Sequence, residues 1–366
     1  MKPVKFGKLK IGGNNPVVII AEIGVDHVGD MSKAKKMIEM ARHAGADVAK
    51  FQIHLPHIEM VPDNSIKFHG GSLFDFFKKS HLTGPQHREL KDHCEKIGIE
   101  YLCTPFCPAS VDILNDIVEV KAFKTGSGEI TNLPQHRKLA KISAKTGKPV
   151  LVSTGMCTMD EIADTVSVYR EESALKNLVL MNCTSEYPLT RYEDISLGLI
   201  EVFKNKFGVL VGQSDHAINN AISFAAVAKG AKIIEKHFTL SYGGPGCDDS
   251  VALEPKAFGD LVKGIRENAS KLNKRDMKIV ELASGSEKTV RLREWPTRNW
   301  AFHSVVTNRP IKKNEKISLT NVRPARPGKG IPAKFLDKKY SGELMGLKVK
   351  KYLPKNYILN WADLEI

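Results

Sequence analysis

Short apolar runs alternate with helix-like stretches along the chain from about residue 17 to residue 238. Each run ends in a polar or glycine-containing loop, and an amphipathic segment follows most of them. The runs are mostly continuous, which is typical of parallel strands buried on both faces. Eight such repeats over roughly 250 residues predict an α/β protein with a (β/α)8 (TIM) barrel, and an open doubly wound sheet is the alternative. The predicted strands are Val17–Ala21, Asp47–Gln52, Ile99–Thr104, Ala122–Thr125, Pro149–Ser153, Leu178–Asn182, Gly208–Val211 and Lys232–His237.

The stretches between the strands carry helix signals. Ser32–Ala44 has its apolar residues on one side, and Gly45 follows in the C-cap position, where a left-handed backbone ends a helix. Two longer insertions, Pro56–Ser80 and Thr239–Pro255, interrupt the repeat. We expect both to overhang one face of the barrel and restrict access to it.

The pattern changes after about residue 274. Short strand-like runs, Ser304–Thr307, Val322 and Gly346–Val349, are separated by prolines and basic residues. This predicts a second, small and mainly β domain. We therefore divide the chain into a barrel domain over 1–280 and a C-terminal domain over 281–366.

Composition narrows the class of protein. Of the 366 residues, 26% are charged and 42% hydrophobic, as in an ordinary globular protein. No apolar run approaches a membrane span and no leader-like segment opens the chain, so a cytoplasmic protein without membrane association is expected. Six scattered cysteines indicate reduced thiols in a packed barrel rather than a disulfide framework. The formal charge of +14 could indicate nucleic-acid binding, but the sequence contains no nucleic-acid recognition motif. Attraction of anionic substrates and solubility explain the charge better.

Two histidines close neighbouring predicted strands. His216 follows the run Val209–Val211, and His237 follows Ile233 and Ile234. The helical stretch between them, Asn220–Lys229, returns the chain for a parallel neighbouring strand, so the two imidazoles are expected side by side at the mouth of the barrel. Neighbouring imidazoles favour a divalent metal, whereas a single strand-end histidine is more often structural.

Other strand ends carry lysines, hydroxyls and carboxylates. Two lysines and several hydroxyls that end different strands converge on one point, which is how a phosphate or a phosphate and a carboxylate are held. Glycines beside Ser127 allow the backbone to approach that anion. With a carboxylate and a metal, the set suits carbon–carbon bond formation between a phosphorylated three-carbon unit and an aldehyde. The residues concerned are Glu22, Lys50, Gln52, Thr104, Lys124, Gly126, Ser127, Gly128, Glu129, Ser153, Thr154, Ser185, Tyr187 and Ser214.

Each assignment has a structural alternative. Lys50 and Lys124 could be solvated strand ends, and Glu22 could merely pair with one of them. Ser153 and Thr154 could cap the helix that begins near residue 159. Among the remaining histidines, His27 fits a turn as well as a site, and the first insertion places the others at the surface: His54, His57 and His69.

Six ordered motifs resemble the N-acetylneuraminate (sialic acid) synthase family, which includes legionaminic and pseudaminic acid synthases. The C-terminal turn Arg326–Gly330 is similar to that family's antifreeze-like, or SAF, domain, so the resemblance covers nearly the whole chain. The motifs are Ala21–His27, Ala46–Gln52, Lys124–Glu129, Ser153–Met156, Ser214–His216 and Glu235–Phe238.

The resemblance implies condensation of phosphoenolpyruvate with an N-acetylmannosamine-type sugar to give a nine-carbon 2-keto acid and phosphate. It implies a divalent metal bound by His216 and His237. The metal is usually manganese, with magnesium or cobalt as alternatives, and His237 is also implied to have a catalytic role. Glu22 or Glu129 would orient or deprotonate the water that adds. The implied phosphoenolpyruvate contacts are Lys50, Thr104, Lys124, Ser127, Ser153 and Ser214. The implied sugar contacts are Gln52, Tyr187, Asp248 and Arg326, the last reaching over the partner's barrel in a domain-swapped homodimer.

Departures from the family pattern concern the substrate. Asp26 and Val28 replace asparagines around His27, and Ser185 stands where some members place an asparagine beside phosphoenolpyruvate. Asp249 stands where a histidine is common. The acceptor is therefore open among N-acetylmannosamine, its 6-phosphate and a diacetamido or 6-deoxy sugar. The alternatives are a phosphoenolpyruvate-dependent synthase for another keto-sugar acid and a catalytically degenerate glycan-binding protein.

Overall fold

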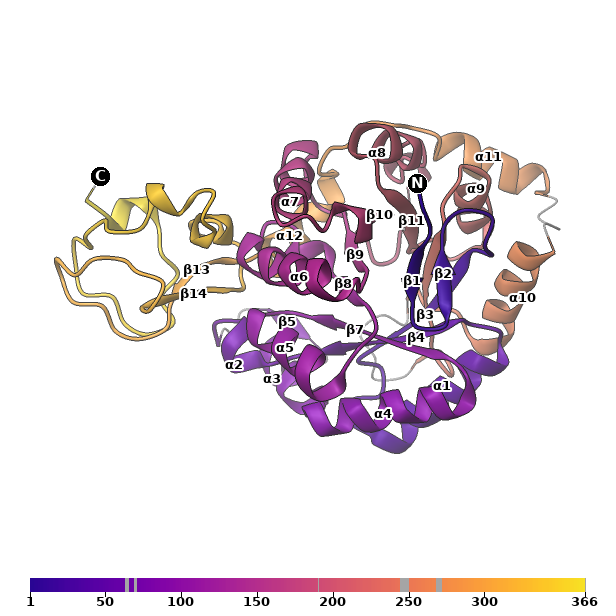
Figure 1. Ribbon diagram of the computed structural model, residues 1–366, viewed down its shortest axis with the longest axis horizontal. Helices are drawn as coiled ribbons and strands as arrows, with labels where there is room; N and C mark the ends of the chain where they lie inside the picture. The colour runs from indigo at the N-terminus through magenta and orange to yellow at the C-terminus, as the bar shows by residue number, and fades with distance from the viewer. Residues whose placement is uncertain (63–65, 69–70, 190, 244–249, 268–271, 366) are drawn as a thin grey trace.

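The computed structural model describes residues 1–62, 66–68, 71–189, 191–243, 250–267 and 272–365. Its larger part is a sheet of eight parallel strands in the order β7-β4-β3-β12-β11-β10-β9-β8 (Figure 1). The two end strands, β7 and β8, lie side by side, so the sheet closes into the predicted barrel and the open sheet is excluded. The strands are β3 (Val18–Gly24), β4 (Val48–Ile53), β7 (Glu100–Pro105), β8 (Phe123–Thr125), β9 (Val150–Ser153), β10 (Leu178–Cys183), β11 (Leu210–Asp215) and β12 (Ile233–His237).

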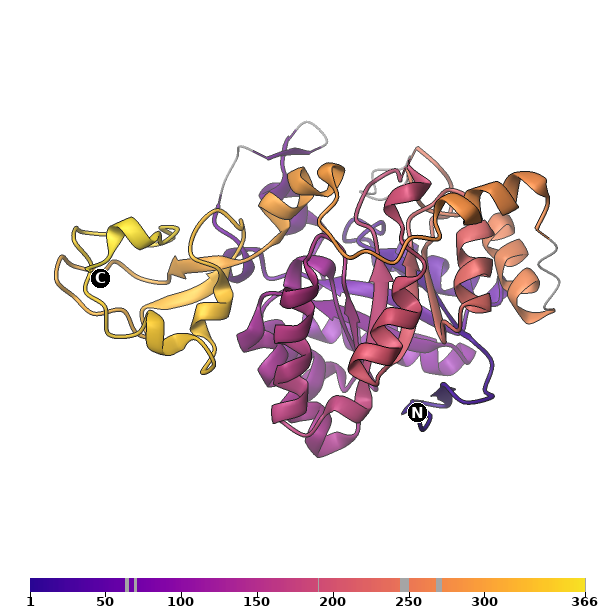
Figure 2. The ribbon, with the colours of Figure 1, turned by 90° about the horizontal axis from the view of Figure 1, so that it is seen from above.

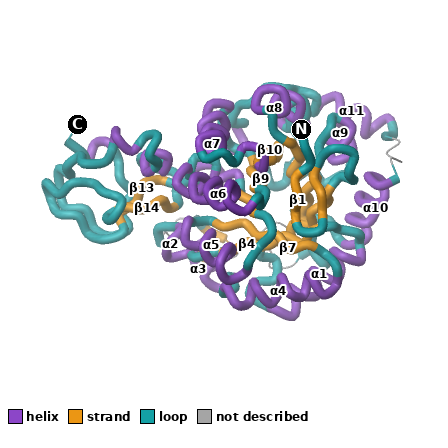
Figure 3. The backbone as a smooth tube through the Cα atoms, viewed as in Figure 1, coloured by secondary structure: helices purple, strands orange, loops and turns teal. Residues whose placement is uncertain are grey.

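Helices surround these strands on the outside (Figure 3). The predicted helix after the first barrel strand is confirmed within one residue: Asp30 caps its start, and Gly45 lies just past its end with φ +90°. None of the described helices is long and apolar enough to cross a membrane. The helices around the barrel are α1 (Met31–His43), α4 (Gly84–Ile97), α5 (Pro108–Asp112) running into η1 (Ile113–Val118), α6 (Leu133–Thr146), α7 (Met159–Glu171), α8 (Leu199–Phe207), α9 (Ala221–Ala228), α10 (Pro255–Arg266) and α11 (Lys274–Leu282).

Side chains that point into the barrel form two layers. The lower layer is apolar and packs against an N-terminal hairpin of β1 (Val4–Phe6) and β2 (Leu9–Ile11), whose Val4, Phe6 and Ile11 are buried. The sequence prediction missed this hairpin because each strand has only three residues and carries lysines. Because the hairpin closes the lower end, polar inward-pointing residues are confined to the upper, carboxyl end.

The first insertion packs over the upper end of the barrel, as predicted. It contains α2 (Pro56–Glu59), β5 (Lys67–Phe68), β6 (Gly71–Ser72) and α3 (Leu73–Ser80). Its apolar residues, including Leu73 and Phe77, form a small cluster against which Trp300 packs. Figure 2 shows this insertion, in purple, beside the orange helices of the linker. The second insertion is described only in part, and Phe238 and Leu253 form a bridge at its base.

The C-terminal part follows a linker with η5 (Leu292–Glu294) and α12 (Trp295–Ala301). It contains the predicted strands β13 (Ser304–Thr307) and β14 (Val322–Ala325) around an apolar core of its own. The predicted strand Gly346–Val349 is wrong: only Lys348 and Val349 form isolated bridges, because Gly346 has φ +87° and turns the chain. The domain boundary at residue 280 stays a prediction.

The C-terminal part docks on α6 and α7 through polar contacts, of which the pair of Arg137 and Asp337 is buried. Arg137 donates to both carboxylate oxygens of Asp337, at 2.6 and 2.8 Å, and the side chain of Asp337 is 1% exposed. Asp164 accepts from the hydroxyl of Tyr340 at 2.6 Å and from Lys339 at 2.7 Å. A bidentate arginine–carboxylate pair fixes orientation as well as distance, so these contacts set where the C-terminal part meets the barrel.

Replacing Asp337 by asparagine is expected to lower the free energy of unfolding by about 3 kcal/mol, because it leaves a buried guanidinium without its main partner. Arg137 keeps Glu171 and Glu172, so the loss should not exceed that. Thermal unfolding together with limited proteolysis of the linker measures the effect. Lys338→Ala is the control, since that side chain is 63% exposed and its removal should change neither measurement. Equal behaviour of the two variants would contradict this role for the pair.

Candidate active site

A cavity of about 370 Å³ opens at the upper end of the barrel. It gathers nearly all of the residues that the sequence singled out, which come from all eight strands or the loops after them and from the C-terminal part. The predicted residues that line it are Glu22, Lys50, Gln52, Thr104, Lys124, Ser127, Ser153, Ser185, Tyr187, Ser214, His216, His237 and Arg326. Asp248 lies outside the described residues. Glu129 does not line the cavity and is fully buried beneath it.

Strand alternation explains why these side chains converge. Lys50 and Gln52 lie two residues apart on β4 and therefore point to the same side, into the barrel. The same spacing places Glu235 and His237 together on β12. Parallel pairing then sets Glu22 opposite both Lys50 and His237 on the neighbouring strands. The inward positions become polar only at the carboxyl ends, so they assemble into one site.

Two buried lysines share a carboxylate at the floor of the cavity. Nζ of Lys50 lies 2.9 Å from Oε2 of Glu22 and 3.3 Å from Oε1 of Glu235. Nζ of Lys124 lies 3.5 Å from the same oxygen of Glu235 and donates to Oγ of Ser153 at 2.6 Å. The alternative that Glu22 pairs with a lysine is confirmed, and the alternative that the lysines are solvated is wrong, since both are at most 3% exposed.

Glu235 is the carboxylate that the sequence analysis passed over. Burial raises its pKa, but Lys124 and Lys50 outweigh burial and bring the pKa down to about 2. Glu22 differs: burial raises its pKa above the ordinary value, with Lys50 opposing. The site therefore holds one firmly ionised carboxylate and one that takes up a proton more readily. The signal that could have identified Glu235 is its position two residues before His237.

Two glycines allow close packing around Ser127. A side chain on Gly155 would meet Oγ of Ser185 at 2.2 Å and Oγ of Ser127 at 2.7 Å. The backbone N–H of Gly155 donates to Oγ of Ser127 at 3.0 Å. A side chain on Gly128 would meet the carbonyl of Ala301 at 2.6 Å, so Gly128, which also lines the cavity, makes room for the linker. Its expected role beside an anion stays a prediction.

The helix-capping alternative for Ser153 and Thr154 is wrong. α7 is capped by Thr158, which forms a capping box with Glu161. Thr154 instead donates its hydroxyl to the carbonyl of Met181 at 3.0 Å. Ser153 is therefore left to contact Lys124 at the floor of the cavity.

His216 and His237 lie side by side, as the sequence predicted, with ring centroids 5.2 Å apart. Burial lowers the pKa of His216 to about 4 and that of His237 well below its ordinary value. Both rings are therefore neutral at physiological pH. Nδ1 of His216 lies 2.8 Å from the carbonyl oxygen of Thr184 and must donate to it, which leaves Nε2 facing the hydroxyl of Tyr187 at 3.2 Å.

This arrangement fits a divalent metal. Ligating histidines are neutral and commonly donate their other ring nitrogen to a backbone carbonyl, as His216 does. The described residues contain no group of three or more histidine, cysteine or acidic side chains placed to hold a metal. Two imidazoles are thus the protein ligands that the described residues offer, and the remaining positions would fall to substrate or water.

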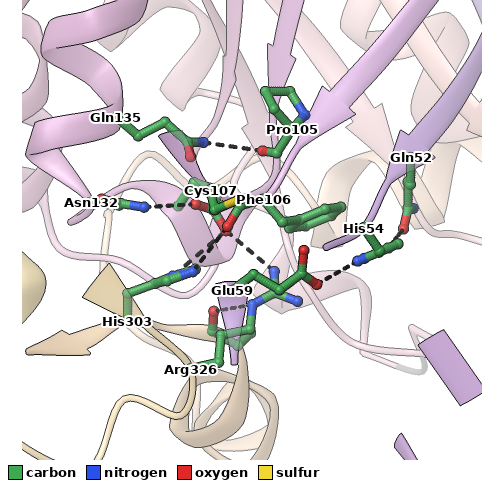
Figure 4. A network of polar contacts seen from close by, with 12 residues as sticks. Gln52, His54, Glu59, Pro105, Phe106, Cys107, Asn132, Gln135, His303 and Arg326 are labelled. Carbon is green, nitrogen blue, oxygen red and sulfur yellow. Dashed lines mark hydrogen bonds and ion pairs between the residues drawn. The ribbon is translucent and has the colours of Figure 1, made fainter. Parts of the chain in front are cut away.

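Arg326 lines the cavity from the C-terminal part, and Figure 4 labels it among the polar contacts of this region. Its guanidinium lies 4.4 Å from the ring of Phe106, donates to the carbonyl of Ala301 at 3.0 Å and reaches Oε1 of Glu129 at 3.2 Å. Burial raises the pKa of Glu129 to about 8, although Arg326 opposes the shift. The resemblance predicts Arg326 in the partner's barrel, whereas in this single chain it enters the chain's own cavity, because the linker runs across the chain's own barrel.

The linker also holds the loops after β9 and β10. Oε1 of Glu294 accepts the backbone N–H groups of Met156 and Ser185, both at 2.8 Å, and Glu294 is 1% exposed. Ser185 lines the cavity, so the linker fixes part of its wall. The sequence prediction missed this role, since an isolated glutamate in a linker gives no periodic signal. It also missed the apolar part of the lining: Ile66, Phe68, Leu73, Phe106, Met156 and Trp300.

The four other histidines that the sequence analysis considered have different outcomes. His27 lies in a turn, where its Nδ1 accepts the backbone N–H of Gly29 at 3.0 Å. His57 is exposed, as predicted. His54 contradicts the prediction of a surface position: it is fully buried, because it continues the inward alternation of Lys50 and Gln52 beyond the end of β4. His69 lies outside the described residues.

All five described cysteines are buried free thiols, as predicted, and the sixth, Cys247, lies outside the described residues. Burial raises the pKa of Cys103 and brings that of Cys107 to about 11. They are therefore neutral thiols in the barrel wall rather than reactive groups.

The fold and the cavity define a TIM-barrel protein with a strand-end site to which the C-terminal domain contributes Arg326. The sequence profile of the NeuB family matches residues 37–277, and that of the SAF domain matches residues 302–365. The chain therefore belongs to the NeuB family and carries a C-terminal SAF domain.

Several relatives have named activities or solved structures. The N,N'-diacetyllegionaminic acid synthase of Campylobacter jejuni is 37% identical over 86% of this chain and 92% of its own length. The human N-acetylneuraminate-9-phosphate synthase is 36% identical over 70% of this chain and 71% of its own length. The crystal structure of the Bacillus subtilis spore coat polysaccharide biosynthesis protein SpsE superimposes with a TM-score of 0.81 at 28% identity, covering 100% of this chain and 99% of that one.

Proposed function

We propose that this chain condenses phosphoenolpyruvate with an N-acetylmannosamine-type sugar, forming a nine-carbon 2-keto acid and releasing phosphate. One observation carries the proposal: two buried lysines with serine hydroxyls and a pair of neutral imidazoles share one cavity of about 370 Å³. Cationic side chains and hydroxyl groups suit the binding of a small acid that carries a phosphate group. Paired imidazoles suit a metal next to a carbonyl group.

The anion half of the site is formed by Lys50, Lys124, Ser127 and Ser153. Lys124 is held by Ser153 at 2.6 Å and by Glu235, and burial lowers its pKa although Glu235 opposes the shift. The phosphate and carboxylate of phosphoenolpyruvate would add the negative charge that these cations favour. Thr104, Ser185 and Ser214 complete the implied contacts: Thr104 lies 3.4 Å from Lys50, and Ser214 donates to Glu235 at 3.1 Å.

The acceptor half is formed by His216, His237, Gln52 and Tyr187. A divalent ion, for which we propose manganese, would supply Lewis acidity that polarises the aldehyde of the open-chain sugar. The carbonyl of Thr184 keeps Nε2 of His216 free of a proton, so this nitrogen is ready to bind a cation. Gln52 and Tyr187 both line the cavity and would hydrogen-bond to the sugar.

We assign to Glu22 the role of orienting or deprotonating the water molecule. This water adds before phosphate leaves. Glu22 lines the cavity, whereas Glu129 lies beneath it. Burial raises the pKa of Glu22, so its carboxylate accepts a proton more readily than a solvated one. Glu129 would act instead by holding Arg326 at the rim of the cavity.

We propose an acceptor that is not phosphorylated. The cations among the described lining residues are Lys50, Lys124 and Arg326. The two lysines are assigned to phosphoenolpyruvate, and Arg326 already lies 3.2 Å from a carboxylate oxygen of Glu129. Much of the remaining wall is apolar, including Phe68, Phe106 and Trp300. Apolar walls suit methyl and acetamido groups better than a phosphate. A diacetamido or 6-deoxy mannosamine fits this wall, in line with the named activity of the Campylobacter relative.

The cellular setting follows from the same proposal. Phosphoenolpyruvate is a central metabolite, so we propose a cytoplasmic enzyme. The homodimer that the resemblance implies stays a prediction, and the position of Arg326 supports a site that each chain completes for itself.

Phosphate release from phosphoenolpyruvate tests the proposed function. With manganese, we expect release only when a mannosamine derivative is present, and faster turnover with a diacetamido sugar than with N-acetylmannosamine 6-phosphate. Mass spectrometry should detect the nine-carbon acid. Turnover with arabinose 5-phosphate alone would contradict the proposal and support a synthase of another keto-sugar acid.

A further inference from the structure

The side-chain amide of Gln52 is held between two groups at the edge of the cavity. Its nitrogen donates to Oε1 of Glu22 at 2.8 Å. Its oxygen lies 3.1 Å from Nε2 of His54. An amide nitrogen only donates and an amide oxygen only accepts, so with Glu22 ionised the nitrogen faces Glu22 and the oxygen faces His54.

His54 must therefore carry a hydrogen on Nε2. Its other ring nitrogen, Nδ1, lies 2.6 Å from Oε1 of Glu59, and Oε2 of Glu59 accepts the backbone N–H of Leu55 at 2.9 Å. In this orientation a second proton lies between Nδ1 and that carboxylate oxygen; burial lowers the pKa of His54, and the carboxylate of Glu59 opposes that shift. Glu59 thus fixes the ring so that Nε2 points at Gln52, as a carboxylate does behind many functional histidines.

Neither partner can turn away. His54 and Glu59, both labelled in Figure 4, are 0% exposed. The imidazole is stacked between Phe77 and Phe106, with ring centroids at 3.9 and 4.4 Å. Gln52 is only partly buried and lines the cavity. The rigid pair is therefore placed behind a side chain that would otherwise be able to flip its amide.

We infer that His54 and Glu59 are positioning residues that lock the amide of Gln52 with its nitrogen toward Glu22 and the cavity. Nothing in the sequence comparison assigns them a role. The inference rests on the proposed function in one respect, namely that the ligand that Gln52 meets is the sugar. Without the pair, the amide oxygen can turn toward the carboxylate of Glu22, and a hydrogen-bond donor to the sugar is lost.

The backbone of Glu59 ties this pair to the C-terminal domain. Its carbonyl accepts the backbone N–H of Arg326 at 2.8 Å, and the N–H of Val61 donates to the carbonyl of Arg326 at 2.8 Å. The segment 52–61 therefore carries Gln52 at one end and pairs with the backbone of Arg326 at the other. The side chains of Gln52 and Arg326 both line the cavity. The same segment that supports the sugar-side amide also receives the arginine that closes the site.

Two substitutions of His54 separate positioning from packing. His54→Gln places an amide nitrogen near the position of Nε2 and keeps a donor for Gln52. His54→Asn places its nitrogen near Nδ1 and loses that donor. We expect His54→Asn to raise the apparent KM for the sugar about tenfold, the size of one hydrogen bond, with the KM for phosphoenolpyruvate unchanged. His54→Gln should stay within about threefold of wild type, and the exposed His57→Asn should have no effect.

Equal losses in the two His54 variants would overturn the inference, because only packing would then matter, and so would a normal sugar KM in His54→Asn. A second readout does not depend on activity: nitrogen NMR of histidine-labelled wild-type protein, assigned with the His54 variants, should show Nε2 of His54 protonated. A bare Nε2 would overturn the inference even if the enzyme is active. Wild-type protein that turns over no sugar would instead count against the proposed function alone.

Discussion

Replacing His237 by alanine is expected to lower condensation by at least about 10³-fold, the loss associated with removing a main electrostatic stabiliser. Its imidazole lies 5.2 Å from that of His216, centroid to centroid, and burial keeps it neutral at physiological pH. One remaining imidazole would hold a divalent ion weakly. The fold should survive, since β12 keeps its pairing with β3 and β11.

Phosphate release and a thermal melt measure the two parts of this expectation, and titration with manganese measures binding directly. His43→Ala is the control, because that residue is exposed at the end of α1 and should affect none of the three. Full activity of His237→Ala, or of wild-type protein in metal-stripped buffer, would contradict the metal assignment.

Replacing Arg326 by alanine should raise the apparent KM for the sugar by about 30-fold or more while phosphoenolpyruvate binding is kept. The guanidinium lines the cavity and stacks on Phe106, so its removal would delete a charged hydrogen-bond donor to the sugar, which contributes about 1.5 to 3 kcal/mol. Lys50 and Lys124, which would hold phosphoenolpyruvate, are untouched by the change. A normal sugar KM would count against a place for Arg326 in the acceptor site.

Mixing inactive variants tests which chain supplies the arginine. In this chain Arg326 enters its own cavity, so a mixture of Arg326→Ala and His237→Ala protein, unfolded and refolded together, should regain no activity. In a domain-swapped dimer, a mixed pair would contain one complete site. Recovery of a substantial fraction of wild-type activity would therefore show that the partner provides Arg326.

The barrel could be predicted from the sequence because its signal is local and repeated. Each predicted barrel strand overlaps an observed one, and residues at the carboxyl ends of parallel strands must meet at one end of a closed barrel. Lys50, Lys124, His216 and His237 were therefore found from their positions alone. The N-terminal hairpin gave no such signal, since its three-residue strands are defined only by the barrel floor on which they pack.

The misassigned residues depend on long-range contacts. His54 follows the last residue of β4, where an insertion begins, so the sequence places it in a surface loop; the rings of Phe77 and Phe106 bury it. Glu294 lies in a linker and acts through backbone groups of Met156 and Ser185, which are more than 100 residues away. For His54 the one local signal was its spacing. It lies two residues after Gln52 and four after Lys50, and so continues the inward-pointing positions of β4.

The most direct test of the account is the fate of the bridging oxygen of phosphoenolpyruvate. With 18O at that position, a mannosamine-derived acceptor and a divalent metal, we expect mass spectrometry to find the label in phosphate and an unlabelled nine-carbon keto acid, because water adds to the enol carbon before phosphate leaves. Label retained in pyruvate or in the sugar acid, or phosphate release that does not require the sugar, would contradict the assignment of this cavity as a condensing site.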